Sequence, residues 1–97
     1  MTTVKLNVSD KDICFECVNH ADDHDACTIY STLCNVLVSA CIPYGIMPKV
    51  YEPGHVIIVV HEYTEKVLAV FQAVYRTFEE TKETYKNICL IRVSDMV

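Results

Sequence analysis

The stretch NHADDHDACTIYS, residues 19–31, separates two kinds of hydrophobic pattern. In residues 13–18 (ICFECV), just before it, every second side chain falls on the same face. From about residue 26, apolar residues instead recur every three or four positions. Alternation predicts a half-buried strand, and the longer period predicts a helix over residues 26–42. The stretch itself therefore predicts a polar loop that runs into the first turn of a helix.

The same two patterns account for the rest of the chain. Residues 3–8 (TVKLNV) alternate and lead through a short polar turn into the next strand, which predicts a hairpin. A second hairpin is predicted around Pro53-Gly54, and Thr64 is the candidate N-cap of a second helix with one apolar face. The predicted strands cover residues 3–8, 13–18, 49–52, 56–61 and 88–93, and the predicted helices cover residues 26–42 and 64–85.

This order, ββαββαβ, predicts a single α+β domain over residues 1–97. Two layers are expected: a largely antiparallel sheet and two helices packed on it. The length is close to the commonest domain size, and 52% hydrophobic residues suffice for a core. In the first helix, Leu33 and Val36 belong to one apolar stripe, and Cys34 and Val38 belong to an adjoining one. This helix is therefore expected to be heavily buried.

Composition and charge exclude several classes of function. The net charge is −5 and the eight Lys and Arg residues are scattered, whereas a duplex-binding protein gathers basic residues against phosphates. Nucleic acid is therefore not an expected partner, and a neutral or basic peptide suits the charge better. Residues 1–12 lack a signal-peptide core, and the longest apolar stretch, residues 36–47, is broken and too short to span a bilayer. We expect a cytoplasmic protein with no membrane partner, whose six cysteines are thiols.

Cys27 is the candidate nucleophile because it falls in the first turn of the first predicted helix. Unpaired N–H groups and the helix dipole favour an anion there, and the thiolate is the reactive form of cysteine. His20 and His24 lie in the preceding loop, and either side chain is able to accept the thiol proton. Ser31 follows one helical turn later on the same face, where its hydroxyl could donate to an oxyanion.

Two other interpretations apply to these residues. Cysteine is commonly a small buried hydrophobe, which is the expected state of Cys34, Cys41 and Cys89. The second interpretation is a zinc site, whose candidate ligands are Cys14, Cys17, His20, His24 and Cys27. However, Cys14 and Cys17 are three apart on a predicted strand and so point to opposite faces, whereas structural zinc sites take such a pair from a turn. Neither a metal nor another cofactor is predicted.

The loop and helix start resemble the ribosomal-processing cysteine proteases. That family carries Gly-His-Ala at the end of its second strand and Cys-Ala-x-x-Ser at the start of the following helix. Here His20-Ala21 stands after the second predicted strand, and Cys27-Thr28-Ile29-Tyr30-Ser31 opens the helix. The order of elements is also similar, so the resemblance covers nearly the whole chain. The chain departs from the family in having Asn19 in place of the Gly, a shorter loop without Gly, and Asp25 one position closer to the cysteine.

The resemblance implies a cysteine endopeptidase in which Cys27 is the nucleophile and His20 is the general base. Ser31 and Asp25 would be supporting residues, and His24 is the alternative base. Family members remove an N-terminal extension from a large-subunit ribosomal protein, phage-borne relatives are associated with capsid-protein processing, and members are homodimers. The expected partners are thus a protein or peptide substrate and a second copy of the chain. The alternative is a catalytically degenerate interaction module with the same fold.

Overall fold

A computed structural model describes residues 1–94 of the chain. The elements are β1 (Thr2–Val8), β2 (Asp12–Val18), α1 (His24–Cys41), a 3-10 turn (Ile42–Tyr44), β3 (Val50–Glu52), β4 (His55–His61), α2 (Glu65–Lys82) and β5 (Ile88–Ser94). The predicted order ββαββαβ is confirmed. The largest difference in bounds is at the end of α2, which was expected to reach residue 85. Tyr85 has left the helix, and its carbonyl accepts a hydrogen bond from the Tyr30 hydroxyl of α1.

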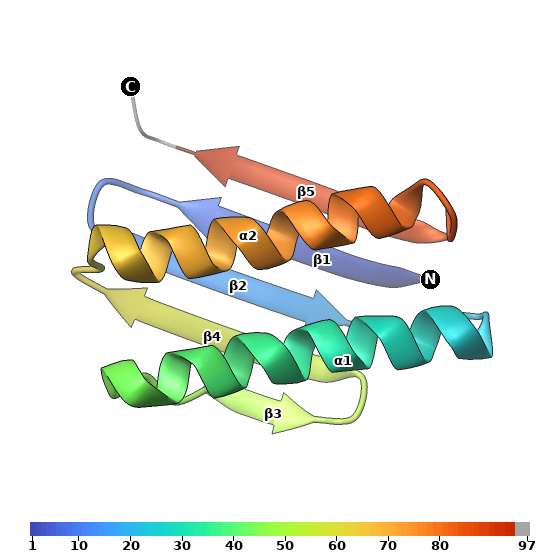
Figure 1. The fold of residues 1–97 in the computed structure, drawn as a ribbon, viewed down its shortest axis with the longest axis horizontal. Helices are drawn as coiled ribbons and strands as arrows, with labels where there is room; N and C mark the ends of the chain where they lie inside the picture. Colours follow the sequence, from blue (N-terminus) through green and yellow to red (C-terminus); the bar gives the residue numbers. More distant parts are fainter. Residues whose placement is uncertain (95–97) are drawn as a thin grey trace.

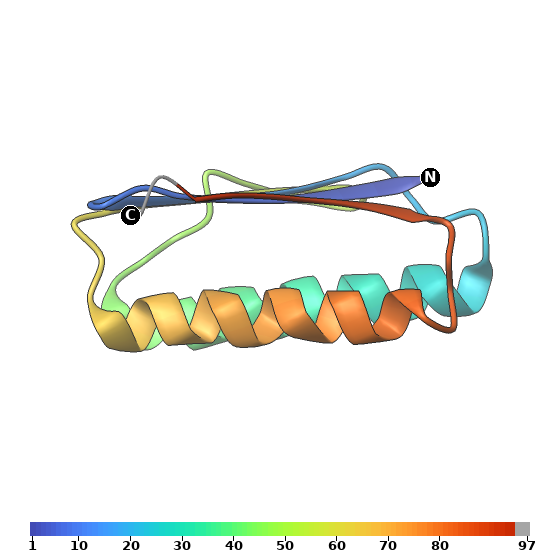
Figure 2. The ribbon, with the colours of Figure 1, turned by 90° about the horizontal axis from the view of Figure 1, so that it is seen from above.

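The five strands form one sheet in the order β3-β4-β2-β1-β5. All neighbours are antiparallel except β1 and β5, which run parallel. Both helices lie side by side on the same face of the sheet, and its other face carries no helix (Figures 1 and 2). The predicted two-layer α+β fold with a largely antiparallel sheet is therefore confirmed.

The alternating residues of the three central strands build the core between the layers. Leu6, Phe15 and Ile58 are paired across β1, β2 and β4, and all three are fully buried. The Phe15 ring lies 6.3 Å from the ring centroids of both Phe71 and Phe78 of α2. Such aromatic pairs add about 0.5–1.5 kcal/mol beyond the area that they bury. These contacts fix α2 over the centre of the sheet.

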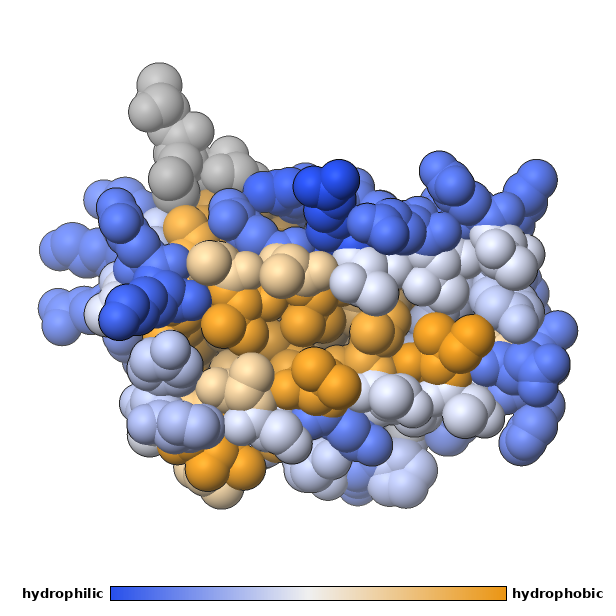
Figure 3. Space-filling view, viewed as in Figure 1, coloured by the Kyte–Doolittle hydropathy of each residue, from blue (hydrophilic) through white to orange (hydrophobic). Residues whose placement is uncertain are grey.

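One core expectation for α1 is wrong. Val36 was placed on a buried stripe, but its side chain is 52% exposed. The residues of α1 that face the sheet are Ala26, Tyr30, Cys34, Leu37, Val38 and Cys41. A helix in a two-layer fold buries only the side toward the sheet, so a second apolar stripe stays outside. Figure 3 shows this apolar surface running along the helix layer.

By length and apolar composition alone, residues 24–44 would be sufficient to cross a bilayer. The core helix of a packed domain satisfies the same two criteria, and the buried residues of α1 pack in the core.

One end of the sheet gathers the segments that the sequence singled out. β2 ends at Val18, and β4 begins opposite it, because Val18 pairs with His55. The loop after β2 and the turn between β3 and β4 therefore lie next to each other. The start of α1 follows the loop at the same end (Figure 1).

Candidate active site

The path of the chain out of β2 is set by Asn19. This residue has a φ of 71°, in the left-handed region, and its N–H donates to the carbonyl of Gly54 over 2.8 Å. Glycine and asparagine occupy this region at the lowest steric cost. A Gly, which the resembled motif has at this position, would meet the same backbone requirement. The reversal at Asn19 takes His20 out of the sheet and toward α1.

The start of α1 is capped by Asp23, a role that the sequence analysis did not assign. Its carboxylate accepts hydrogen bonds from the N–H groups of Asp25 at 2.8 Å and Ala26 at 3.2 Å. An Asp just before a helix is a strong N-cap signal, so the pattern was available in the sequence. The helix consequently begins at His24, two residues earlier than expected.

Cys27 closes the first turn of α1, and its own N–H bonds the carbonyl of Asp23 over 2.9 Å. The expectation that unpaired N–H groups surround this thiol is therefore wrong. The Asp23 cap and the first helical bond already use the amides of residues 25–27. Any activation of the thiol would then depend on a neighbouring side chain rather than on free helix amides.

That neighbour is His20. Its Nδ1 lies 3.7 Å from the Sγ atom of Cys27, within hydrogen-bonding range for sulfur. Cys27 is half-buried and His20 is exposed, so the pair is open to solvent and to a substrate. The thiol donates to Nδ1 in one protonation state, and Nδ1–H donates to the thiolate in the other. The structure brings together the two residues that the resemblance paired.

The pair stands at the edge of a pocket with a volume of about 330 Å³. The buried residues Cys17, Tyr30 and Cys34 form part of its lining, between β2 and α1. Ser31 and Asn35 follow Cys27 at four-residue spacing along α1, and both also line the pocket. The pocket is thus largely apolar, with polar side chains along the wall that α1 forms. Such a pocket is suited to bind an apolar side chain of a peptide.

The β3–β4 hairpin forms the opposite wall of the pocket. Tyr51 and Glu52 of β3 and the turn residues Pro53 and Gly54 line this side. The Tyr51 hydroxyl donates to Oδ1 of Asn35, which ties the hairpin to α1 across the pocket.

The buried thiol of Cys34 differs chemically from that of Cys27. A hydrogen bond with Cys17, reinforced by burial, raises the pKa of Cys34 well above its ordinary value. Cys34 therefore remains a neutral thiol, which is not the reactive form of cysteine.

Two of the other predicted site residues lie outside the pocket. His24 is the exposed first residue of α1, and its carbonyl accepts from the Thr28 hydroxyl. Asp25 is also exposed, and its backbone N–H donates to Asp23. Neither residue is among those that line the pocket, whereas Ser31 is.

Within residues 1–94, no group of three or more His, Cys, Asp or Glu side chains is arranged to hold a metal ion. Cys14 is exposed and Cys17 is buried, so the prediction that they point to opposite faces of β2 is confirmed. All six cysteines are free thiols.

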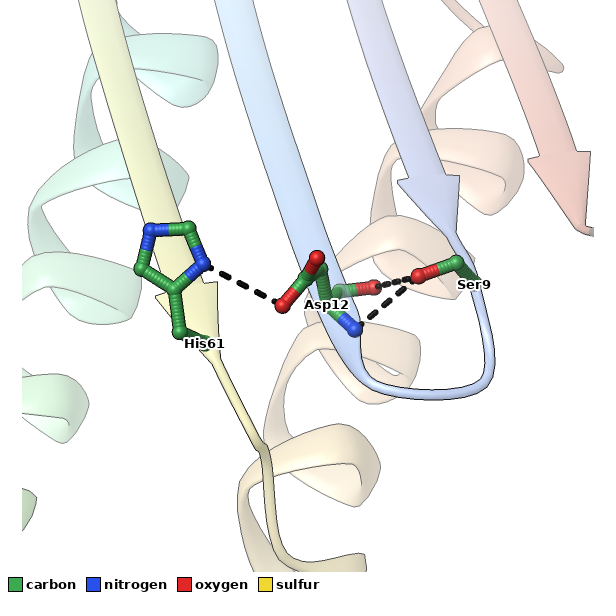
Figure 4. A network of polar contacts seen from close by, with 3 residues as sticks. All are labelled: Ser9, Asp12 and His61. Carbon is green, nitrogen blue, oxygen red and sulfur yellow. Dashed lines mark hydrogen bonds and ion pairs between the residues drawn. The ribbon is translucent and has the colours of Figure 1, made fainter.

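A second polar cluster lies at the other end of β2. His61 Nδ1 is 3.2 Å from Oδ1 of Asp12, and Ser9 is bonded to the backbone of Asp12 (Figure 4). Although the three residue types are those of a hydrolase triad, the Ser9 hydroxyl engages the backbone and not the imidazole. The His61 and Asp12 side chains are 79% and 54% exposed, so their pairing is a surface ion pair of small energy. This cluster closes the β1–β2 turn.

Comparison with known proteins identifies solved structures with the same fold. No family model and no curated protein matches the sequence. Among solved structures, the essential ribosomal processing protease Prp from S. aureus, in complex with a covalently linked product peptide, superposes with a TM-score of 0.76 and 24% identity. The match covers 95% of this chain and 99% of that one.

The chain has the fold of a ribosomal processing protease. A hypothetical protein from Staphylococcus aureus also matches, with a TM-score of 0.58, 22% identity, and coverage of 95% of this chain and 99% of that chain. Each match covers nearly all of this chain and of the matched one, so the likeness is one of the whole fold.

Proposed function

We propose that this protein is a cysteine endopeptidase of the ribosomal-processing type. The observation that carries the proposal is the approach of Cys27 Sγ to His20 Nδ1, 3.7 Å apart, beside a pocket in a protease fold. The matched protease holds a covalently linked product peptide, which supports a peptide as the substrate of this chain as well.

In the proposed reaction, His20 Nδ1 accepts the proton of the Cys27 thiol, and the thiolate sulfur attacks the scissile carbonyl carbon. The tetrahedral intermediate collapses with cleavage of the C–N bond, and His20 returns the proton to the departing amine. A thioester to Cys27 remains. His20 then takes a proton from water, the hydroxide adds to the thioester carbonyl, and the C–S bond breaks. The acid product leaves and Cys27 regains its proton.

The supporting residues have different proposed roles. Ser31 lines the pocket one helical turn beyond Cys27, and its hydroxyl would donate to the oxyanion of the intermediate. Asp25 lies in the first turn of α1, where a carboxylate stabilises the positive end of the helix dipole. Its support for Cys27 would therefore be exerted through the helix and not through contact with substrate.

The proposed substrate is the N-terminal extension of a large-subunit ribosomal protein. Glu52 lines the pocket, and Asp22, Asp23 and Asp25 lie near Cys27 around the start of α1, so the surroundings of the catalytic pair are acidic. Like charges repel across a cleft, so the residues next to the cleaved bond should be neutral or basic. A phage structural protein, the other substrate implied by the resemblance, finds no support in either matched structure. We further propose that the protein acts in the cytoplasm as a homodimer.

The first prediction tests the catalytic pair. Cys27→Ala, His20→Ala and His24→Ala are assayed on peptides that span the junction between such an extension and the mature ribosomal protein. Cys27→Ala should abolish cleavage, because the thioester cannot form. His20→Ala should lose about 10²–10⁴-fold in kcat, the usual contribution of a general base. His24→Ala should retain activity, because this side chain is not on the pocket.

Two outcomes would contradict this assignment. Cleavage by Cys27→Ala at the wild-type rate would rule out the whole proposed mechanism. Loss of cleavage in His24→Ala with full activity in His20→Ala would transfer the role of base to His24.

The alternative function is a peptide-binding module without catalysis. The observation that favours it is the Asp23 cap, which occupies helix amides that would otherwise be free to bind an oxyanion. Iodoacetamide labelling separates the two functions, with the exposed Cys14 as an internal reference. A catalytic Cys27 should be alkylated faster than Cys14 at neutral pH, and a module should show no such difference.

A further inference from the structure

The turn between β3 and β4 lies against the ring of His20. Pro53 and Gly54 form this turn, and Gly54 has a φ of 77°, as is typical of the third residue of a type II turn. The pairing of Val18 with His55 brings Gly54 next to Asn19, whose N–H bonds the Gly54 carbonyl over 2.8 Å. The turn is thus held in place directly beside His20.

The space between Gly54 and the imidazole is too small for any side chain. A Cβ atom at Gly54 would lie 2.6 Å from His20 Nε2, 3.0 Å from its Cδ2 and 3.1 Å from its Cε1. The same ring carries Nδ1, which faces Cys27 Sγ at 3.7 Å. The imidazole therefore meets the thiol through Nδ1 and lies directly against the bare backbone of Gly54.

We propose that Gly54 is a positioning residue for the Cys27–His20 pair, an inference that rests on the proposed peptidase function. Its lack of a side chain leaves the slot in which the His20 ring faces the thiol. The atoms that a Cβ would meet belong to an exposed side chain and not to backbone. A substitution would therefore displace the imidazole and leave the fold in place.

The competing explanation is that Gly54 serves only the backbone of its turn. Gly45 is a matched control, because its φ of 75° is almost the same and a Cβ there would meet nothing within 4 Å. Alanine at either position brings the same left-handed strain. Only alanine at position 54 brings the contact with His20.

The experiment compares Gly54→Ala, Gly45→Ala and His20→Ala with the wild type. It measures kcat and KM on the junction peptide, alkylation of Cys27 at neutral pH located by peptide mass spectrometry, and the melting temperature. Both glycine variants should melt at similarly lowered temperatures. Only Gly54→Ala should also lose about 10²-fold in kcat, the loss expected from a misplacement of roughly 1 Å, with KM within about twofold. Alkylation of Cys27 should slow in Gly54→Ala and His20→Ala and not in Gly45→Ala.

Gly54→Asn separates steric displacement from backbone strain, because asparagine tolerates the left-handed region but still carries a Cβ. It should melt close to the wild type and remain impaired in kcat. Recovery of kcat in Gly54→Asn would overturn the inference, as would equal kcat losses in the two alanine variants. Unchanged kcat and alkylation in His20→Ala would instead overturn the Cys27–His20 pair itself, and absence of cleavage by the wild type would overturn the proposed function. An impaired His20→Ala with an unimpaired Gly54→Ala would remove the positioning role alone.

Discussion

At the scale of single residues, the site depends on two positions with a positive φ. Asn19 and Gly54 face each other across one backbone hydrogen bond, and the His20 ring lies against Gly54 and reaches Cys27 through Nδ1. Neither residue reacts with a substrate in the proposed mechanism. Their contribution is geometric, because Asn19 turns the chain out of β2 and Gly54 leaves room for the imidazole.

A prediction at this scale concerns Asn19. Asn19→Gly should keep the free energy of unfolding within about 0.5 kcal/mol, because glycine adopts the left-handed region freely and loses only its own conformational entropy. Asn19→Val should lower it by about 1–2 kcal/mol, because a β-branched residue is strained at a φ of 71°. Urea unfolding of the two variants measures the difference. Equal stabilities would show that the backbone relaxes away from this conformation.

At the scale of elements, α1 both presents the thiol and supplies one wall of the pocket. Its N-terminus is fixed by the Asp23 cap, so Cys27 is held at a defined position along the helix axis relative to His20. One face of the helix packs on the sheet, and the residues at positions 27, 31 and 35 line the pocket. An element with a fixed start and a buried face orients a nucleophile more firmly than a loop does.

The cap gives a prediction with a matched control. Asp23→Ala should lower the free energy of unfolding by about 1 kcal/mol, because two helix N–H groups lose their acceptor. Asp25→Ala removes a carboxylate from the same turn without removing the cap, so it should cost about 0.3–1 kcal/mol at low salt. Denaturant unfolding of both variants tests the ranking. A larger loss in Asp25→Ala than in Asp23→Ala would contradict the assigned cap.

At the scale of the whole molecule, buried tyrosines couple stability to alkaline pH. Burial raises the pKa of Tyr30 and of Tyr75 above the ordinary value of 10.0. The two phenols therefore ionise at a lower pH in the unfolded chain than in the folded one. The stability that they contribute as neutral groups is complete below about pH 10. It is then lost as the pH rises through the pKa values of the folded state.

The corresponding measurement is the free energy of unfolding between pH 8 and pH 11. We expect it to decrease above about pH 10 and to decrease less steeply in Tyr30→Phe. The variant should also be less stable than the wild type at pH 8 by about 0.5–1.5 kcal/mol, because the hydroxyl bonded to the Tyr85 carbonyl is gone. A wild-type value that does not change with pH would count against the buried phenols.

The surface of the whole molecule predicts self-association. Val36 on the helix side is 52% exposed, and Ile91 and Val93 on the open sheet face are 39% and 40% exposed. A small domain that leaves apolar surface on both sides often covers one of them in a dimer. Light scattering at micromolar concentration should give about twice the chain mass of 11.0 kDa. The chain mass itself would contradict the prediction, and the matched variants Val36→Lys and Ile91→Lys would identify the buried side.

The sequence by itself determined the order and approximate bounds of the elements. The two-residue and three-to-four-residue spacings of apolar side chains, together with the turn residues Pro53 and Gly54, were sufficient to predict them. Each of these signals reflects the local geometry of the backbone. The same local signals placed Cys27 in the first turn of a helix. The Asp23 cap could also have been predicted from the sequence. Asp is a preferred N-cap residue, and Asp23 stands just before the segment whose apolar residues recur with helical spacing.

Only the tertiary structure decided which residues meet. The distance of His20 from Cys27, the exposure of Val36 and the closeness of Gly54 to the imidazole all depend on which elements become neighbours. Gly54 lies 34 residues after His20 in the sequence, and the register of β2 with β4 places them side by side. Strand pairing is fixed by the packing of the whole core, and a local pattern carries no information about it. For this reason the sequence named the candidate reacting groups, and the fold alone supplied the arrangement that positions them.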